Sequence, residues 1–513
     1  MTRRSCAMYA TAIISAHLLI VGIALVVGQV FQTLIQNRLK AEIVLKEGSR
    51  VFETWKNPPP PVFMEFFFFN VTNADDVLAG KDKPSVVEVG PYTYREYRPK
   101  DNVTMVENAT RVSAITPKTF HFLPEKSVGD PDLDFITTVN IPAVAVMNQV
   151  KGSFLKATML SMYMNSISAG VFTTRSVNEL LWGYKDPLLS YVKTMKPEVD
   201  EYFGLMLNKN GSNDGVFVYH TGEENYLDYG RVESWKGEKQ LSWWASNQSN
   251  MINGTDGSAF HPFLTKEERL DVFTADLCRS IHMRFEKEVE VKGIQAYRFT
   301  PPREVFADPS ENPANAGFCL PKEKCLKTGV LSISVCRKGA PVVASFPHFY
   351  LGDETYVDAI EGLSPNREHH QTFLDLNPTT GAPVRACKRA QINIFLERIS
   401  GFPQTKKLTG IVFPVLFLNE SVVVDDVTAA KLHKLLLMVT LVSHFPLLIV
   451  GLGVLMFLIT LILIIQFCRA KTPGKKDTVY SPVSSKEKEE DPLENNTKNG
   501  TYIGLSPVEM PKS

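Results

Sequence analysis

The chain has 513 residues, and its 55 basic and 55 acidic side chains leave a formal net charge of zero. This balance offers no case for nucleic acid binding, because such a partner requires an excess of Lys and Arg. Apolar residues make up 44% of the chain. They gather in two long runs near its ends, which is typical of a membrane protein.

Residues 8–31 form the first apolar run, and Arg3 and Arg4 precede it. A cleavable signal peptide has an apolar region of only about 7–15 residues, and no small-x-small cleavage pattern follows this longer run. The run therefore favours an uncleaved membrane anchor, with residues 1–7 in the cytosol. A cleavable signal peptide is the alternative. Arg38 and Lys40 follow soon after, so basic residues do not orient this segment.

Residues 32–444 carry the marks of an exported domain. Most of the seven cysteines lie there, and so do Asn-x-Ser/Thr sequons at Asn70, Asn102, Asn108, Asn210, Asn247, Asn253 and Asn419. Sequons also arise by chance, as at Asn495 and Asn499. Because the sequons and the cysteines agree, we predict a glycosylated lumenal or extracellular domain. No linker or fixed-period repeat divides it, which favours one large ectodomain.

The ectodomain is rich in predicted strands. A helix is expected first at 41–55, where apolar residues such as Ile43, Val44, Val51 and Phe52 recur at helical spacing. Strands are then expected at 62–70, 85–95, 102–116, 119–123, 216–220, 286–299, 330–336, 342–350, 390–396 and 408–418. These runs are rich in β-branched and aromatic residues and are bounded by turn formers. We predict an α+β fold with a large antiparallel sheet that closes toward a β-barrel.

Residues 141–195 interrupt the strands and are predicted to be helical. Ser176 with Glu179 forms a capping box, and Asp186 before Pro187 is a second helix start. Upstream, residues 154–167 are apolar nearly all round, which is typical of a buried helix. The alternative is an exposed apex, where flexible methionines suit a binding surface. The second interpretation predicts a partner-binding apex made of Leu155, Met159, Met162, Tyr163, Leu181 and Trp182.

The second apolar run, residues 435–468, contains no Lys, Arg, Asp or Glu. A helix needs about 20 apolar residues to cross a bilayer. Pro446 is expected at the start of the helix, because proline is tolerated in a first turn, so the span is predicted at 445–467. Basic residues follow at once (Arg469, Lys471, Lys475 and Lys476), which predicts a cytosolic tail at 468–513.

The tail has no apolar periodicity and is predicted to be disordered. It contains two tyrosines with a bulky apolar residue three positions on: Tyr480 with Val483, and Tyr502 with Leu505. This pattern is read by clathrin adaptors as an extended peptide and predicts a sorting address. Cys6 and Cys468 lie at the cytosolic membrane edges, where they are candidates for palmitoylation or are simply small apolar residues.

Catalytic motifs are absent from the sequence: it contains no Gly-x-Ser-x-Gly elbow, no His-Glu-x-x-His and no P-loop lysine motif. Glu368, His369 and His370 are adjacent, and we interpret them as a solvated loop rather than a metal site. His348 and Asp375 have no nucleophile partner visible in the sequence. The chain is therefore predicted to be a receptor or transporter without a cofactor, not an enzyme.

Five short strings of the ectodomain are distinctive. They are Gly-Pro-Tyr-Thr-Tyr-Arg at 90–95, Leu-Trp-Gly-Tyr-Lys-Asp at 181–186, Asn-Met-Ile-Asn-Gly-Thr-Asp at 250–256, Cys-Arg-Ser at 278–280 and Phe-Pro-His-Phe at 346–349. These strings resemble signatures of the class B scavenger receptor family. The resemblance extends from the first anchor to the second. Other strings, such as 86–94, 128–131 and 202–205, are most similar to the family's lysosomal member.

The resemblance implies two membrane spans with cytosolic ends, and a β-barrel ectodomain with a helical apex and a lipid tunnel. It implies disulfides Cys278–Cys336 and Cys319–Cys325, which the residues alone do not decide because four cysteines allow three pairings. Cys387 is then left as a buried free thiol. The family's lysosomal member carries β-glucocerebrosidase on its apical helices. Its tail ends in an acidic dileucine signal, whereas here Glu494 stands in place of the second apolar residue.

Two functions are therefore predicted as alternatives. The first is a lysosomal membrane receptor that delivers a β-glucocerebrosidase-like hydrolase and transfers lipid or cholesterol. The second is a cell-surface scavenger receptor for lipoproteins or fatty acids, which the terminal Pro511-Lys512-Ser513 weakens because it lacks the apolar end of a PDZ ligand. A structural membrane glycoprotein with a closed core is a more distant third.

Overall fold

The computed structural model describes residues 3–321 and 325–471. These residues form two compact units. One comprises Ile20–Val450 and contains the ectodomain, and the other joins residues up to Leu19 with those from Gly451. Each unit is described by itself below.

Apolar helices occupy both ends of the described chain. They are α1 (Arg3–Val27), followed by α2 (Val30–Glu42), and α11 (Asp426–Lys471). Cys6–Val27 and Asp426–Arg469 are long and apolar enough to cross a membrane. Within the larger unit, Gly22 lets the two helices approach closely, since a Cβ there would lie 2.8 Å from Cγ2 of Val450.

Two details of the anchors differ from the prediction. Pro446 lies inside α11 rather than at its start. The helix continues through it because a spanning helix tolerates the loss of one backbone hydrogen bond. The first run is interrupted after Val27, because Gln29 adopts the left-handed conformation with φ of 48°.

The core of the ectodomain is an 11-stranded sheet in which all pairs are antiparallel. In spatial order its main path is β12 (Arg269–Thr274), β13 (Arg279–Val291), β14 (Ile294–Thr300), β17 (Phe373–Leu376), β18 (Pro383–Glu397), β19 (Thr409–Val423), β1 (Val62–Val71), β2 (Val86–Tyr97) and β5 (Thr119–Phe122). β15 (Val330–Ser332) and β16 (Val342–Ser345) join it through β18. Among the described strands this path ends at β12 and β5, so the sheet is antiparallel as predicted, but no closed barrel is seen.

Smaller sheets complete the strand content. One has the order β11 (Val232–Trp235), β10 (Phe217–His220), β4 (Arg111–Ile115) and β3 (Asp101–Val106). The two pairs are β6 (Phe135–Val139) with β7 (Phe172–Ser176), and β8 (Tyr184–Lys185) with β9 (Tyr202–Phe203). The predicted strand at 102–116 is thus a hairpin, because Glu107, Asn108 and Ala109 have positive φ and turn the chain.

The helices of the ectodomain are short. They are α3 (Arg50–Lys56), α4 (Ala74–Ala79), α5 (Ile141–Val150), α6 (Phe154–Ser166), α7 (Val177–Trp182), α8 (Pro187–Met195), α9 (Glu354–Asp358) and α10 (Arg367–His370). The predicted helix at 41–55 is wrong over its middle, because α2 ends at Glu42 and Ser49 caps a new helix by accepting from the Phe52 N–H. The capping box of Ser176 with Glu179 and the cap at Asp186 are confirmed.

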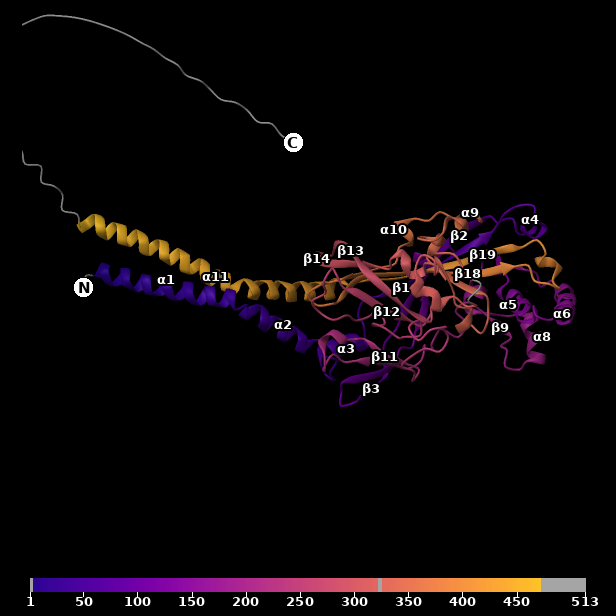
Figure 1. Cartoon of the computed structure of the whole chain (residues 1–513), viewed down its shortest axis with the longest axis horizontal. Helices are drawn as coiled ribbons and strands as arrows, with labels where there is room; N and C mark the ends of the chain where they lie inside the picture. Colours follow the sequence, from indigo (N-terminus) through magenta and orange to yellow (C-terminus); the bar gives the residue numbers. More distant parts are fainter. Residues whose placement is uncertain (1–2, 322–324, 472–513) are drawn as a thin grey trace, which may run out of the picture. The chain divides into compact units, whose positions relative to one another are not determined.

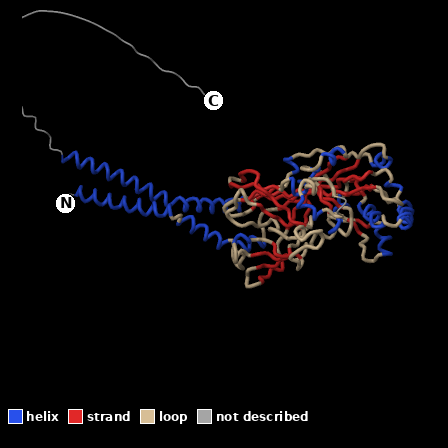
Figure 2. The backbone as a smooth tube through the Cα atoms, viewed as in Figure 1, coloured by secondary structure: helices blue, strands red, loops and turns tan. Residues whose placement is uncertain are grey.

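Helices α5, α6 and α8 gather at one end of the strand-rich region (Figure 1). Figure 2 shows the strands between this helical end and the end at which α2 leaves the ectodomain. We call α5, α6 and α8 the apical helices. The strands β18 and β19 run toward them, and the apolar side chains of these strands share a core cluster with those of α5 and α6. The apex is therefore supported by the central sheet.

Candidate functional site: the apical helices and the enclosed charges

One side of α6 presents large apolar side chains to solvent. We call this set the apical ridge, and its members are exposed by 65–71%: Phe154, Leu155, Met159 and Met162. The opposite side of the helix is buried in the core through Ala157, Leu160 and Met164. The interpretation of a helix buried all round is therefore wrong, and α6 carries an apolar surface that no other described residue covers.

The other predicted apex residues are less accessible than the ridge. Tyr163 is half-buried and stacks on Tyr191 of α8, with ring centroids 3.9 Å apart. Leu181 is fully buried in a cluster with aromatic residues of β1 and β2, because α7 packs directly against the sheet. Trp182 is half-buried and donates its indole N–H to the Tyr94 hydroxyl at 3.1 Å. Leu181 and Trp182 thus belong to a different core cluster from the buried side of α6, and Leu181 offers no surface to a partner.

Charges around the apex are largely paired. Lys151 lies 3.1 Å from Glu397, and Lys185 and Lys193 both lie 3.2 Å from Glu201. Lys156 of α6 is exposed. Pairs as accessible as these contribute little to stability, and they leave the apical surface without a dominant sign of charge. Recognition at this surface would therefore depend mainly on apolar contacts.

A second feature lies on the face of the sheet that packs against α7. We call it the enclosed charge cluster, and it consists of Glu96, Arg98, Asp276, Lys388 and Glu420. Met64 of β1 lies between Tyr94 of β2 and Glu420 of β19, and Glu420 pairs in turn with Lys388 of β18. Antiparallel register thus brings charged residues from three strands to one place.

The ion pairs of this cluster are unequal. Arg98 forms an ion pair with Glu420 and lies 4.0 Å from Glu96. Lys388 lies 2.8 Å from Asp276 and 3.6 Å from Glu420. The Glu96 side chain has no exposed area, and neither of its carboxyl oxygens has a hydrogen-bond partner. Glu96 is therefore the poorly satisfied member of the cluster.

This inequality separates the pKa values of the two neighbouring glutamates. Burial, and then repulsion by Glu420, raises the pKa of Glu96 to about 7. Burial acts on Glu420 in the same direction, but Arg98 and Lys388 outweigh it and lower the pKa of Glu420 to about 2. Glu96 therefore titrates near neutral pH while Glu420 stays ionised.

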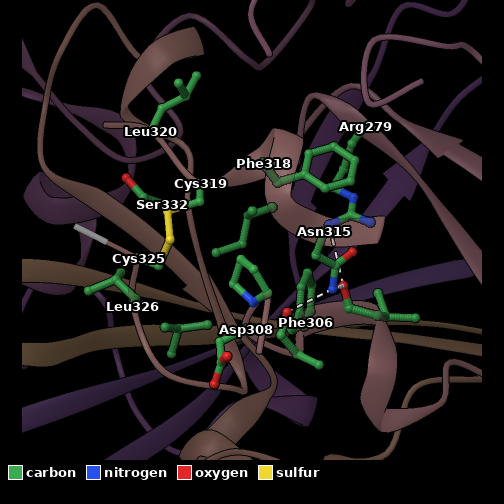
Figure 3. Close-up of a pocket in the computed structure, with 15 residues that line it drawn as sticks. Arg279, Phe306, Asp308, Asn315, Phe318, Cys319, Leu320, Cys325, Leu326 and Ser332 are labelled. Atoms are coloured by element: carbon green, nitrogen blue, oxygen red, sulfur yellow. Dashed lines mark hydrogen bonds between the residues drawn. A yellow bond between two sulfur atoms is a disulfide. The ribbon is translucent and has the colours of Figure 1, made fainter. Parts of the chain in front are cut away.

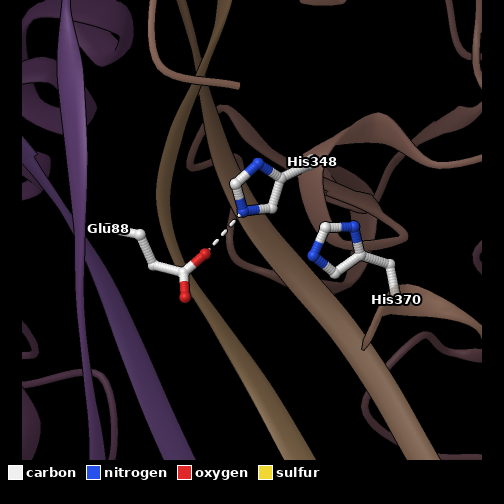
Figure 4. Close-up of side chains that lie close together, drawn as sticks. All are labelled: Glu88, His348 and His370. Carbon is white, nitrogen blue, oxygen red and sulfur yellow. Dashed lines mark hydrogen bonds and ion pairs between the residues drawn. The ribbon is translucent and has the colours of Figure 1, made fainter. Parts of the chain in front are cut away.

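A buried histidine pair was not anticipated from the sequence. His348 and His370 are each 4% exposed, and their rings stack in parallel at 4.4 Å (Figure 4). His348 Nε2 lies 2.7 Å from the Glu88 carboxylate on β2. The prediction of a solvated loop at 368–370 is therefore wrong for His370, which ends α10 and turns inward. Glu88 and His348 are 260 residues apart, so no local pattern could have paired them.

The ligand atoms of Glu88, His348 and His370 all lie within 4.8 Å of one another, which raises the question of a metal. The donor geometry argues against one. Nδ1 of His348 accepts the Ser364 N–H at 3.0 Å, and Nδ1 of His370 accepts the Asn366 N–H at 2.9 Å. Ligating histidines instead donate an N–H from the nitrogen that does not bind the metal. The two histidines are thus better described as a stacked, buried pair that accepts hydrogen bonds from backbone N–H groups, and burial lowers the pKa of His370 to about 3.

The disulfides Cys278–Cys336 and Cys319–Cys325 are both present, and this is the pairing that the resemblance implies. Cys387 is half-buried and free, and burial raises the pKa of its thiol. Cys6 and Cys468 are exposed on the terminal helices. The predicted sorting residues Tyr480, Val483, Tyr502 and Leu505 lie outside the described residues.

The predicted glycosylation sites differ in access. Four are exposed: Asn102, Asn108, Asn210 and Asn247. Three are half-buried: Asn70, Asn253 and Asn419. Asn419 lies within β19, where its amide donates to Glu65 at 2.6 Å and accepts from Arg389 at 3.2 Å. The exposed group is therefore better placed to carry glycans.

Comparison with known proteins is in keeping with this architecture. The sequence pattern of the CD36 family matches residues 13–464. Lysosome membrane protein 2 of Homo sapiens is 44% identical over 449 residues, which are 88% of this chain and 93% of that protein. Scavenger receptor class B member 1 of Mus musculus is 35% identical over 451 residues, which are 87% of each chain. The chain therefore belongs to the CD36 family of class B scavenger receptors.

Proposed function

We propose that this protein is a lysosomal membrane receptor that binds a soluble hydrolase, of the β-glucocerebrosidase kind, through its apical ridge. In the same proposal the ectodomain passes lipid, such as cholesterol, toward the membrane, and clathrin adaptors read Tyr480 and Tyr502 in the tail. The observation that carries the proposal is the exposure of four large apolar side chains on α6.

The ridge has the properties of a helix that docks into a groove. Its members lie at positions 154, 155, 159 and 162, which fall on one side of a helix. Burying each of these side chains in a partner would contribute about 1.5–3 kcal/mol. Two of the four are methionines, whose flexible side chains adapt to an irregular groove.

The titration of Glu96 agrees with a lysosomal location. Glu96 favours its protonated form below about pH 7, which suits a protein that resides in an acidic compartment.

The capture proposal is tested with Met159→Glu/Met162→Glu in the full-length protein. We expect capture of purified β-glucocerebrosidase to fall by at least about 100-fold, because two apolar anchors are lost and two charges would have to be desolvated. Met251→Glu, at an exposed methionine outside the apical helices, is the matched control and should bind normally. Retained capture by the double variant would contradict the proposal.

A cell-surface scavenger receptor is the second candidate, and it is favoured by the similarity to scavenger receptor class B member 1. The steady-state location of a tagged full-length protein separates the two. Lysosomal residence supports the first candidate, whereas residence at the plasma membrane together with uptake of labelled lipoprotein would replace it.

A further inference from the structure

We infer that Arg279 holds a small monovalent anion, with chloride as the fitting example, in a pocket beside the Cys319–Cys325 disulfide (Figure 3). This inference is independent of the proposed function. It rests on a buried cation that lacks a counter-charge among the described residues, on the pocket that the cation lines, and on the size of that pocket.

Arg279 is the first residue of β13 and is only 5% exposed. Its guanidinium lies over the Phe318 ring, 3.6 Å from the centroid. Nε donates to the Ser280 carbonyl and Nη1 to the Val305 carbonyl, each at 3.3 Å. A guanidinium has five N–H donors, so these two long bonds leave most of its hydrogen-bonding capacity unused.

No described carboxylate neutralises this charge. Asp308 is the one acidic residue among the described residues that line the pocket. Its two oxygens already accept from Ser310 and Thr328. Carbonyl oxygens and an aromatic ring attract a cation, but they carry no net charge. A buried ion without a counter-ion is costly, so an anion from solution would be stabilised here.

Arg98 in the enclosed charge cluster provides a comparison. Its side chain is 30% exposed, and Glu420 and Glu96 offset the effect of burial and raise its pKa. For Arg279 burial is the one influence, and it lowers the pKa to about 9. An anion beside Arg279 would supply the interaction that Glu420 supplies to Arg98.

The pocket limits the size of the ligand. Its volume is about 40 Å³, and a cavity of about 10–15 Å³ already holds one water. Val305, Phe306 and Leu331 are among the apolar residues that line it, beside the polar side chains of Asn315 and Ser332. A single small anion fits this space.

The test uses the full-length protein in detergent at pH 7 and constant ionic strength. Thermal unfolding is followed while sodium gluconate is replaced by sodium chloride or bromide. We expect a saturable rise in the unfolding midpoint in both halides, and we expect Arg279→Gln to abolish it. Arg303→Gln is the matched control, because Arg303 is an accessible arginine in the same region and pairs with Glu311.

Direct detection keeps the inference testable if Arg279→Gln fails to fold. Bromide in crystals of the unsubstituted protein should give an anomalous peak within hydrogen-bond distance of the guanidinium, and excess chloride should remove it. Equal midpoints in chloride and gluconate would overturn the inference. So would a halide response retained by Arg279→Gln, or an anomalous map without a peak at Arg279.

Discussion

Replacing Glu96 by Gln should remove one contribution to the dependence of ectodomain stability on pH. Glu96 is buried, lacks hydrogen-bond partners and has a pKa of about 7 in the folded protein. Between about pH 4.5 and pH 7, the folded protein therefore keeps Glu96 protonated, whereas the unfolded chain has already released this proton. Stability from this group is present in acid and is lost as the pH rises.

The size of the effect follows from the two pKa values. A glutamate pKa of 4.5 in the unfolded chain and about 7 in the folded protein gives a loss of about 2 kcal/mol between pH 5 and pH 7.5. Glu420 works in the opposite sense, because its pKa of about 2 makes it stabilising above about pH 4.5, and this contribution is lost only as the pH falls further. His370 also works in the opposite sense, because its pKa of about 3 costs the folded protein stability as the pH falls below about 6.5. The contribution of Glu96 is therefore measured as the difference in stability between the unsubstituted protein and Glu96→Gln.

The assay is chemical or thermal unfolding of the full-length protein at pH 5, 6, 6.8 and 7.5. The stability of Glu96→Gln relative to the unsubstituted protein should rise by about 2 kcal/mol from pH 5 to pH 7.5. Glu125→Gln, at an exposed glutamate, should keep the original dependence. A difference in stability between Glu96→Gln and the unsubstituted protein that stays constant or falls from pH 5 to pH 7.5 would refute the reasoning.

Three further sets of variants test other parts of the chain. Leu181→Ala should lower the unfolding free energy by about 2–5 kcal/mol in a denaturation assay, because Leu181 is fully buried. Leu155 is 71% exposed, so Leu155→Ala should change the unfolding free energy by no more than about 0.5 kcal/mol in the same assay. Removal of the Cys278–Cys336 disulfide, which spans 58 residues, should lower the unfolding free energy by about 4 kcal/mol. Removal of the Cys319–Cys325 disulfide, which spans 6 residues, should lower it by only about 2 kcal/mol. Both values are measured by unfolding of paired Cys→Ala variants. Tyr480→Ala/Tyr502→Ala should move the protein from lysosomes to the cell surface in localisation by microscopy, and unchanged localisation would place the address elsewhere.

Local chemistry was predictable from the sequence where a few neighbouring residues decide it. The caps at Ser176 and Asp186 depend on side chains within three residues, and the structure has both. The exposure of Met159 and Met162 was not decidable in this way, because the helix is apolar on all sides. Which side is buried depends on the core from β18 and β19, far along the chain.

The enclosed charge cluster and the buried histidine pair could not be predicted from the sequence either, because they too depend on contacts between distant parts of the chain. Glu96 and Glu420 meet only through the registers of β1 with β2 and with β19. His348 and Glu88 are brought together by packing across 260 residues. A strand pattern predicts which residues share a face, but it does not predict which strands become neighbours. Most of the interactions that the sequence did not predict are long-range contacts of this kind.

The connection between Glu96 and the apex is short, and it bears on how acid affects capture. Glu96 and Tyr94 are two residues apart on the same face of β2, and Tyr94 accepts the indole N–H of Trp182 in α7. β2 is hydrogen-bonded to β1 on one side and to β5 on the other. These two neighbours restrain β2, so a change in the charge of Glu96 should not move the strand. Titration of Glu96 should therefore change stability and leave capture unchanged. Equal capture by the unsubstituted protein and Glu96→Gln at pH 7.5 would agree with this separation. If capture by these two proteins differs, the Glu96→Gln change is repeated in a Trp182→Phe background. Loss of the difference there would show that the contact between Tyr94 and Trp182 transmits the charge to the apex.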